Sequence, residues 1–388
     1  MISDVYFPRV NGVSTSIMTF KQHFEAQGHQ ITLIAPDYPT ISNDENDKDD
    51  TIIRIASRQV ILDPEDRLMK TSDIQKQVDQ LSHIQFDILH IQTPFIAHYQ
   101  GVKIAKRLNI PLVETCHTFF EEYFYNYIKF LPKSFLKSIA RYFTRSQCKQ
   151  MNALIVPSEP MKKVLEHYDV DARMQVLPTG IDLECIKPGN GAAFREKHNI
   201  SPTRPVLVHI SRVAFEKNID FLIHVVDTVR RTIPDILFII AGEGPAESSL
   251  HKLTEQLNLT DNILFLGYMD RNKELMDCYS AGDAFIFASR TETQGLVLLE
   301  AMALGLPVVS TAVMGTKSIL SANKGALIAE DDQQDFSEKV IQLMQSEELQ
   351  KRLSQEAIDY AKTWSAPVLA DKMINFYRHE IDLHLAKN

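Results

Sequence analysis

Short runs of apolar residues alternate with longer amphipathic stretches along nearly the whole chain of 388 residues. The short runs have the length of buried strands, and the stretches between them carry the 3.6-residue period of helices. Such alternation is typical of βαβ units, in which crossover helices join parallel strands, so it predicts an α/β fold. The runs that we interpret as strands are Gln30–Ala35, Asp87–Ile91, Pro111–Thr115, Ala153–Val156, Val206–Ile210, Ile236–Ala241, Ile263–Leu266, Ala284–Ala288 and Pro307–Ser310. Those that we interpret as helices include Ser14–Gln27, Gly101–Asn109, Asn218–Arg231, Gly295–Leu304 and Pro367–Leu385.

The chain is too long for one typical core, so two domains are expected. The segment Pro178–Gly191 carries helix breakers and no helical period, which indicates a boundary. We predict one Rossmann-like domain over residues 1–182 and another over residues 183–364. A C-terminal helix over residues 365–388 is expected to pack back on the first domain. Two doubly wound sheets that face each other across a cleft would bind ligands outside the carboxyl ends of their strands.

The start of the chain offers only Met1–Val5 as a first strand, which is short for such a domain. Either a few residues are missing upstream or the chain begins late, and the sequence leaves both open. We expect no signal peptide, because polar residues interrupt the start: Ser3, Asp4, Arg9 and Asn11. No apolar run approaches the length of about 18 residues that a membrane-spanning helix needs.

Composition and charge exclude several classes of function. A net charge of −9 argues against general nucleic-acid binding. The four cysteines lie far apart in the sequence, without metal-ligand or disulfide spacing, so a reducing cytoplasm fits best. Two acidic segments could be considered as metal sites. We interpret Asp169–Asp171 as an exposed turn and Asn43–Asp50 as a solvated loop. We therefore predict no essential metal.

Several candidate ligand-binding residues of the second half follow strands directly. Arg212 and Lys217 lie in the loop after Val206–Ile210, where two cations suit a diphosphate. Gly244 ends the next strand within the sequence AGEGP and lets backbone approach a ligand. Tyr268 and Met269 follow the third strand within the sequence GYMD.

The most informative segment is RTETQGLVLLEAMALGLP, which follows the strand Ala284–Ala288. Gly295 opens a helix there, so its own N–H group and that of Leu296 can meet an anion or a sugar hydroxyl. Glu292 and Glu300 lie eight residues apart, and a carboxylate accepts paired hydrogen bonds from vicinal hydroxyls. Each feature alone can also be explained without a ligand. A glutamate near the start of a helix, for example, commonly stabilises the helix through its dipole.

Two features of the first half follow strands in the same way. Gly12 lies in the turn FPRVNGVSTS, at its bend, where it could face a ligand or only form the turn. His117 comes just after the strand Pro111–Thr115, on the ligand side by the strand-end rule, although a lone histidine is more often structural. His90 is a supporting candidate.

In this order, these motifs are similar to the retaining GT-B glycosyltransferases of family GT4, whose signature is a Glu-x7-Glu pair. The resemblance covers nearly all of the chain. It implies that Glu292 and the backbone of Gln294–Leu296 contact the donor hexose, and that Glu300 binds the ribose. It also implies that Arg212 and Lys217 hold the diphosphate.

The resemblance further implies that the backbone near Tyr268 and Met269 lies by the base, that the Gly12 turn faces the donor phosphates and the acceptor, and that His117 lies beside the reacting sugar. Many members have Phe where this chain has Gln294, and TETQGL resembles the branch that glycosylates diacylglycerol. The reaction implied is retaining, by front-face attack in which the leaving phosphate accepts the acceptor's proton, with no required metal.

The segment from Tyr123 to Ser158 contains no acidic residue. At about 100° per residue, its cations sweep one side of a helix and its bulky apolar residues the other. This pattern suits an anionic membrane surface, or an apolar face packed on the protein's own core. The cations that we assign to membrane contact are Lys133, Lys137, Arg141 and Arg145. The apolar residues opposite are Phe135, Leu136, Ile139, Tyr142 and Phe143, downstream of an aromatic cluster, Phe119–Leu131.

Taken together, the sequence predicts a hexosyltransferase on the inner face of the cytoplasmic membrane, with UDP-glucose as donor and a lipid such as diacylglycerol as acceptor. One alternative is a soluble GT4 enzyme that extends an oligosaccharide or lipopolysaccharide core, with GDP-mannose as a possible donor. Another is a non-catalytic protein that binds a sugar nucleotide. The sequence leaves the base, the linkage and the oligomeric state open.

Overall fold

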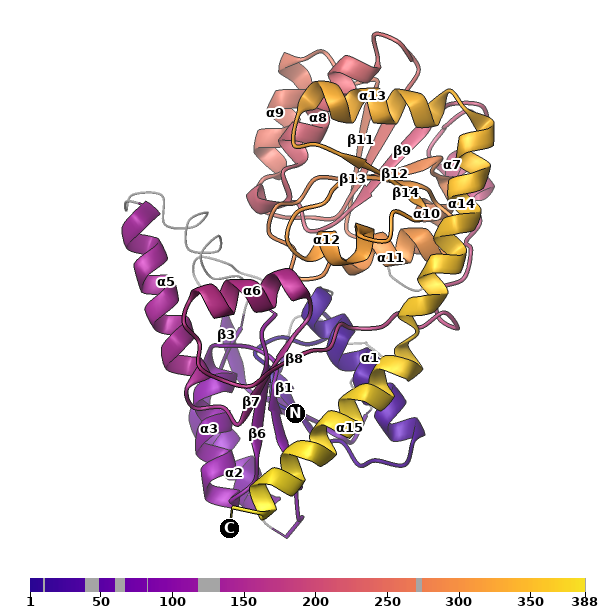
Figure 1. Ribbon diagram of the computed structural model, residues 1–388. Helices are drawn as coiled ribbons and strands as arrows, with labels where there is room; N and C mark the ends of the chain where they lie inside the picture. Colours follow the sequence, from indigo (N-terminus) through magenta and orange to yellow (C-terminus); the bar gives the residue numbers. More distant parts are fainter. Residues whose placement is uncertain are drawn as a thin grey trace. The chain divides into compact units, whose positions relative to one another are not determined.

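The chain forms two compact units in a computed structural model (Figure 1). Residues 1–9, 11–38, 49–59, 67–81, 83–117, 133–269 and 274–387 are described, without the side chains of residues 133 and 134. One unit comprises Met1–Gly180 with Ala366–Asn388, and the other comprises Ile181–Ser365.

The unit of Ile181–Ser365 is built on a six-stranded parallel sheet in the order β11-β10-β9-β12-β13-β14. Its strands are β9 (Val206–Ile210), β10 (Leu237–Ala241), β11 (Ile263–Gly267), β12 (Ala284–Phe287), β13 (Val308–Thr311) and β14 (Ala326–Ala329). Its helices are α7 (Gly191–Lys197), η2 (Phe215–Lys217), α8 (Ile219–Val229), α9 (Glu247–Gln256), α10 (Glu274–Ala281), α11 (Leu296–Ala303), α12 (Gly315–Leu320), α13 (Gln333–Met344), α14 (Glu347–Ala361) and η3 (Lys362–Trp364).

Helices cover both faces of this sheet because successive strand residues point to opposite faces. On β9, Val206, Val208 and Ile210 pack in one core with apolar residues of α7, α10, α11 and α14. Leu207, between them, packs in a second core with residues of α8, α9 and α13. Burial on both faces explains why these strands read as continuous apolar runs in the sequence.

The other unit contains a four-stranded parallel sheet, β5-β6-β7-β8, a parallel pair, β1-β2, and an antiparallel pair, β3-β4. Its strands are β1 (Leu33–Pro36), β2 (Ile52–Ile55), β3 (Ser57–Gln59), β4 (Arg67–Met69), β5 (Leu89–Ile91), β6 (Leu112–Thr115), β7 (Ala153–Val156) and β8 (Met174–Val176). Its helices are α1 (Gly12–Ala26), α2 (Thr71–Gln80), α3 (Ile96–Leu108), α5 (Lys133–Cys148), α6 (Glu159–His167) and α15 (Ala366–Leu385).

The C-terminal helix α15 completes the core of this unit. Met373 and Tyr377 are buried in one cluster with Phe24 of α1 and with Val113 of β6. The ring centroids of Phe24 and Tyr377 are 5.7 Å apart, edge to face. Since all four side chains are almost fully buried, the last helix of the chain is an integral part of the first unit.

The predicted α/β class with parallel sheets in two domains is confirmed by this architecture. The predicted first strand, Met1–Val5, is shorter than expected: Ile2 forms parallel bridges to Ile34 and Ile91, but no strand continues to Val5. Directly after these bridges, hydrogen bonds with side chains replace those between strands, so the backbone leaves the sheet. Ser3 Oγ donates to the carbonyl of Val5 at 2.6 Å, and the Asp4 N–H donates to a side chain, Thr93 Oγ1, at 2.7 Å.

Five short strands did not stand out in the sequence: β2, β3, β4, β8 and β14. Most of their residues are only half-buried or exposed, so they lack the continuous apolar run of a central strand. Among the described residues no helix is both long and apolar enough to cross a membrane.

The packing of α15 predicts the effect of Met373→Ala. Met373 is only 1% exposed, so its loss should leave a cavity and lower the free energy of unfolding by about 2–5 kcal/mol. Urea denaturation would measure this, with Val368→Ala as the control, because Val368 lies on the same helix and is 50% exposed. Equal effects of the two substitutions would contradict the assignment of α15 to this core.

Candidate functional site

The carboxyl ends of β9 and β12 mark the topological switch point of the six-stranded sheet. From β9 the chain order runs outward to β10 and β11, and from β12 it runs outward the other way to β13 and β14. Loops that leave such neighbouring strands separate at this point, and ligands of open α/β sheets bind there.

Lys217 and Glu292 meet across the switch point. Lys217 follows β9 and Glu292 follows β12, and Lys217 Nζ donates a hydrogen bond to Glu292 Oε1 within an ion pair. Their side chains are 20% and 15% exposed, so both charges are largely withdrawn from water while still within reach of a ligand. Asn218 Nδ2 adds a bond to the carbonyl of Ala288 at 3.2 Å, which joins the same two loops.

The loops after β9 and β10 are held together backbone to backbone. The Val213 N–H donates to the Glu243 carbonyl at 2.8 Å. A Cβ on Gly242 would lie 1.9 Å from the Ser211 carbonyl oxygen, and one on Gly244 would lie 2.4 Å from that of Val213. Both glycines also have positive φ angles, of 131° and 158°. Only glycine fits these positions, so the loop that carries Arg212 lies directly against the AGEGP turn.

The loop after β11 joins the same edge of the sheet. The Gly242 N–H donates to the Gly267 carbonyl at 2.7 Å, and the Tyr268 N–H donates to Glu243 Oε1 at 3.2 Å. The Tyr268 side chain is 56% exposed, whereas Met269 is buried. Asp270, the last residue of the GYMD motif, lies outside the described residues.

The segment Gln294–Leu296 forms the entrance to α11. Gln294 is buried, Gly295 has a φ of 96°, and Leu296 is the first helical residue. The first N–H groups of a helix have no intrahelical partner, so this entrance presents donors at the edge of the sheet. Gly295 adopts a left-handed backbone conformation, which residues other than glycine adopt only with strain.

Gly315 supports this segment from the loop after β13. Its N–H donates to the Glu292 carbonyl at 2.7 Å, and a Cβ there would lie 2.2 Å from the carbonyl carbon of Thr293. The preceding residue, Met314, has a φ of 51°, a strained value for a side chain of its size. The sequence interpretation did not include this support, because nothing local in the sequence shows which backbone Gly315 touches.

Glu300 lies on α11 and is 3% exposed. Tyr279 of α10, itself fully buried, donates a hydrogen bond from its Oη to Glu300 Oε2 at 3.1 Å. A buried carboxylate needs such donors. Tyr279 is a second residue that the sequence did not indicate, since its helix reads as an ordinary amphipathic one.

His209 lies on β9 and connects the sheet to the same loops. Its Nε2 is 2.8 Å from Ser211 Oγ, and its Nδ1 is 3.0 Å from the Ile286 carbonyl. Burial lowers the pKa of His209 to about 4, and the charge of Lys217 acts in the same direction. This ring is therefore neutral near pH 7 and contributes hydrogen bonds, not charge.

In the other unit, His117 lies just after β6, as the sequence predicts. Its Nε2 is 3.0 Å from Gln92 Oε1, and Gln92 continues to His90 of β5. Burial lowers the pKa of His117 to about 4. The sequence indicated both histidines but not Gln92 between them.

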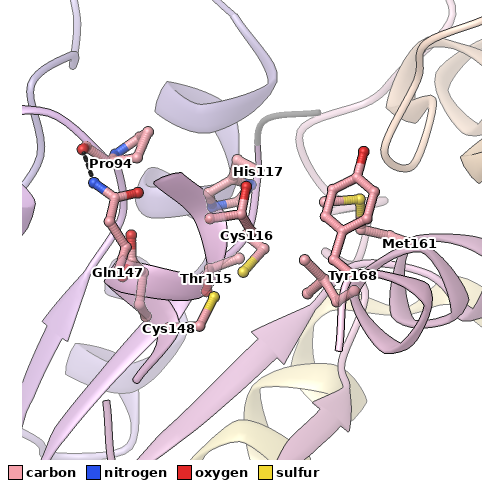
Figure 2. A pocket seen from close by; sticks show the side chains of 11 residues that line it. Pro94, Thr115, Cys116, His117, Gln147, Cys148, Met161 and Tyr168 are labelled. Carbon is pink, nitrogen blue, oxygen red and sulfur yellow. Dashed lines mark hydrogen bonds between the residues drawn. The ribbon is translucent and has the colours of Figure 1, made fainter. Parts of the chain in front are cut away.

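A pocket of about 20 Å³, room for about one water molecule, opens beside His117 (Figure 2). The end of β6, α5 and α6 form its walls, with Cys116, Cys148, Met161 and Tyr168 among the lining residues. A hydrogen bond between the two thiols, together with burial, raises the pKa of Cys116 well above its usual value. A raised pKa makes the thiol a weaker nucleophile at neutral pH than a free cysteine.

Gly12 is the first residue of α1, and Asn11 caps the helix by accepting a hydrogen bond from the Ser14 N–H at 2.9 Å. The prediction that Gly12 forms the bend of the turn is wrong, because its φ is not in the left-handed region and a Cβ there would meet open space. The side-chain cap, not glycine, starts the helix.

The cations assigned to membrane contact lie on helix α5. The apolar residues of this helix divide between a buried and an exposed face. Leu136 is buried against the unit, whereas Phe135, Ile139 and Tyr142 are 53%, 40% and 77% exposed. The apolar residues that the sequence places on one side of the helix therefore do not share one environment, because Leu136 is buried, as is Ala140, while the other three are exposed.

The cations of α5 differ in their surroundings. Lys137 is exposed, and the Arg141 guanidinium lies 5.3 Å from the ring centroid of Tyr168 on its own unit. Arg145 is 3.6 Å from Asp169, a pair between exposed groups that contributes little stability. The side chain of Lys133 and the aromatic cluster Phe119–Leu131 lie outside the described residues.

Within the described part of the chain, no group of three or more histidine, cysteine or acidic side chains could hold a metal ion. Asp169 and Asp171 are both exposed, in the turn between α6 and β8. Apart from Gly12, the residues that the sequence assigned to the donor thus belong to the unit of Ile181–Ser365, whereas Gly12 and His117 belong to the other unit.

Comparison with known proteins identifies relatives for both units. Residues 10–185 match the protein family described as "Glycosyltransferase Family 4". Residues 191–360 match the family described as "Glycosyl transferases group 1".

Individual relatives extend over most of the chain. The chain is 33% identical over 318 residues to the alpha-monoglucosyldiacylglycerol synthase of Streptococcus pneumoniae, covering 80% of this chain and 70% of that protein. It is 26% identical over 390 residues to the synthase of the same name from Acholeplasma laidlawii, covering 98% and 97%. Among solved structures, Anabaena HepE in complex with UDP-glucose has a TM-score of 0.75, with 15% identity, and the match covers 97% of this chain and 99% of that one.

The support of the Glu292 loop by Gly315 predicts that Gly315→Ala is destabilising. The added Cβ forces the loop or α12 to move, so the free energy of unfolding should fall by about 1–3 kcal/mol. Gly12→Ala is the matched control, because its Cβ meets nothing within 4 Å and its effect should stay below about 1 kcal/mol. Urea-unfolding midpoints would measure both, and an unchanged midpoint for Gly315→Ala would contradict the close approach.

Proposed function

Because this chain belongs to the group 1 glycosyltransferases of family 4, we propose that it transfers glucose from UDP-glucose to diacylglycerol with retention of the anomeric configuration. The enzyme class and the GT-B fold are those of the family and of its structural relatives. The sugar and the acceptor are proposed from the two alpha-monoglucosyldiacylglycerol synthases described above.

The observation that carries the donor site is the meeting of Lys217 and Glu292 at the switch point. In the proposal, Lys217 and Arg212 bind the diphosphate, and Glu292 accepts hydrogen bonds from the hydroxyls of the hexose. The ion pair supports this assignment, because a positive charge for the diphosphate and an acceptor for the sugar hydroxyls are needed side by side at the bond that breaks.

The neighbouring loops supply the remaining donor contacts in this proposal. The entrance to α11, Gln294–Leu296, binds the hexose through its N–H groups, and Glu300 binds the ribose. Gly244 lets backbone approach the phosphates, and the segment of Tyr268 and Met269 lies by the base. The hydrogen bonds that connect the loops after β9, β10 and β11 support this assignment, because they hold its parts at one sheet edge.

The chemical step exchanges one bond to the anomeric carbon for another. The bond from that carbon to the diphosphate oxygen breaks, the bond to the acceptor oxygen forms on the same face, and the acceptor's proton passes to the diphosphate. Arg212 and Lys217 stabilise the charge that develops on the leaving group, so the proposed mechanism needs no metal. His117 and the turn at Gly12 are the proposed contributions of the other unit.

The helix α5 is the proposed contact with an anionic membrane. Its exposed apolar residues Phe135, Ile139 and Tyr142 follow each other at helical spacing of four and three residues, which places them on one stripe. Lys137 and Arg145 are exposed on the same helix, Arg145 about a quarter-turn from the stripe and Lys137 on the opposite side. A helix that combines an exposed apolar stripe with exposed cations suits an anionic membrane interface. Together with four free cysteines, this supports a place on the cytoplasmic face of the membrane.

The donor assignment predicts a large loss of transfer in Glu292→Gln. The amide keeps the size of the side chain but loses the charge that grips the hydroxyls, so kcat/KM should fall about 100-fold or more. Labelled UDP-glucose and vesicles that contain diacylglycerol would measure the rate. Glu348→Gln, an exposed acid on α14 of the same unit, is the control.

A wild-type rate in Glu292→Gln would overturn the donor assignment. Transfer from GDP-mannose in place of UDP-glucose would overturn the donor, and transfer only to a soluble saccharide would overturn the lipid acceptor. Since Lys217 and Glu292 touch, the double variant Lys217→Met with Glu292→Gln should lose less than the product of the single losses.

The membrane assignment predicts weaker vesicle binding in Ile139→Ser with Tyr142→Ser. Flotation with vesicles rich in phosphatidylglycerol should recover the wild type at low salt and less of it at high salt, because ions screen the attraction to the cations. The double variant should float at least about tenfold less, since two exposed apolar side chains that would enter the membrane are replaced by polar ones. Val368→Ser, also an exposed apolar position, should float like the wild type. Equal flotation of all three proteins would exclude α5 as the contact.

A further inference from the structure

Behind His117 lies a continuous chain of buried polar side chains. His117 Nε2 is 3.0 Å from Gln92 Oε1, and Gln92 Nε2 is 3.0 Å from His90 Nδ1. The same His90 nitrogen lies 2.5 Å from Tyr377 Oη of α15, and His90 Nε2 lies 2.7 Å from Thr115 Oγ1. Gln92, His90 and Tyr377 are 2%, 3% and 7% exposed, so protein groups, not bulk water, decide where each proton lies.

Tyr377 sets the direction of this chain. Burial raises the pKa of the Tyr377 hydroxyl far above its usual value, so it keeps its proton. A phenol is a stronger hydrogen-bond donor than acceptor, so the Tyr377 hydroxyl donates to an imidazole lone pair of His90. His90 Nδ1 is therefore the acceptor, and the proton of His90 lies on Nε2, where it faces Thr115.

The orientation of the Gln92 amide follows from that of His90. Because His90 Nδ1 carries a lone pair and no proton, only the NH2 group of Gln92 can make the 3.0 Å contact with it, and it shares that lone pair with the Tyr377 hydroxyl. The carbonyl oxygen Oε1 then faces His117 and can only accept. His117 must donate from Nε2, and a neutral ring protonated on Nε2 carries its lone pair on Nδ1.

The remaining nitrogen of His117 is left for a ligand. Within the described residues, Nδ1 of His117 makes no hydrogen bond, and the side chain lines the pocket between β6, α5 and α6. A hydroxyl group that reaches this ring would meet an acceptor.

We propose that Gln92, anchored through His90 by Tyr377, is a positioning residue that fixes His117 in the Nε2–H tautomer, so that Nδ1 accepts a hydrogen bond from a substrate hydroxyl. The role of a substrate rests on the proposed function, because sugars and glycerolipids bring hydroxyls to this residue. The tautomer itself depends only on the four side chains.

The electrostatic surroundings agree with a neutral ring. Burial lowers the pKa of His117 to about 4 and that of His90 well below its usual value. The N-terminal amine and the His117 ring also oppose a charge on His90. The other titratable groups near His117 are Cys116, Cys148 and Tyr168, which line the same pocket, and Glu114, whose pKa is raised by burial. An imidazole that stays neutral around pH 7 can serve as an acceptor there.

Histidine-labelled protein tests the tautomer directly. In ¹⁵N spectra at pH 7, the wild type should show His117 with a protonated Nε2, an unprotonated Nδ1, and an Nε2 proton that exchanges slowly with water. The His117→Gln variant assigns the signals. A protonated Nδ1, or a doubly protonated ring at pH 7, would overturn the proposal.

Two variants separate positioning from folding. Gln92→Met keeps the size of the side chain but removes the acceptor, so the Nε2 proton of His117 should exchange rapidly and kcat/KM should fall about tenfold. Tyr377→Phe removes only one hydroxyl and should shift the His117 signals with a smaller loss of rate. Tyr360→Phe is the control, because its hydroxyl also donates one hydrogen bond, to Ile319, but in the other unit.

The outcomes also separate this proposal from the proposed function. Thermal melting of each variant shows whether it folds, and unchanged His117 signals in folded Gln92→Met and Tyr377→Phe would overturn the positioning role. The expected signals in a wild type that transfers no glucose would uphold the tautomer and overturn the function. Normal transfer by Gln92→Met with a mobile His117 proton would show that the reaction does not depend on this acceptor, and would overturn the role in substrate binding.

Discussion

The adjacency of β9 and β12 in a parallel sheet is the constraint on which the candidate donor site depends. Parallel strands end at the same edge, and the reversal of strand order at this pair leaves space between the loops that follow them. Residues 75 positions apart, Lys217 and Glu292, become ion-pair partners there. The remaining loops are joined to these two by backbone hydrogen bonds, so the sheet sets the geometry of the whole edge.

Close backbone contact is the second constraint, and it explains the glycines. At Gly242, Gly244 and Gly315 a side chain would collide with the main chain of a neighbouring loop. The side chains at this edge are therefore carried on loops that can approach each other closely. Met314 carries backbone strain beside them, which the surrounding contacts maintain.

The other unit is organised by the need to satisfy buried polar groups. His90, Gln92, Thr115 and Tyr377 lie in an apolar setting, where an unpaired polar atom would cost more than a hydrogen bond contributes. Their mutual bonds remove that cost and also fix proton positions. The C-terminal helix thus contributes both to the core, through Met373, and to the polar chain behind His117, through Tyr377.

The sequence by itself determined the fold class and most central strands, because strands buried on both faces appear as unbroken apolar runs whatever their partners are. It also indicated which loops carry charged and polar side chains, since strand ends can be located from those runs. Only the tertiary structure decided what these side chains touch. The bond between His90 and Tyr377 joins residues 287 positions apart, and no local pattern encodes such a contact. For the same reason the sequence indicated one apolar side on α5, whereas its packing buries Leu136 and leaves Phe135, Ile139 and Tyr142 exposed. A periodic pattern gives the direction of each side chain around its helix, but the neighbours that a helix meets decide which directions are buried.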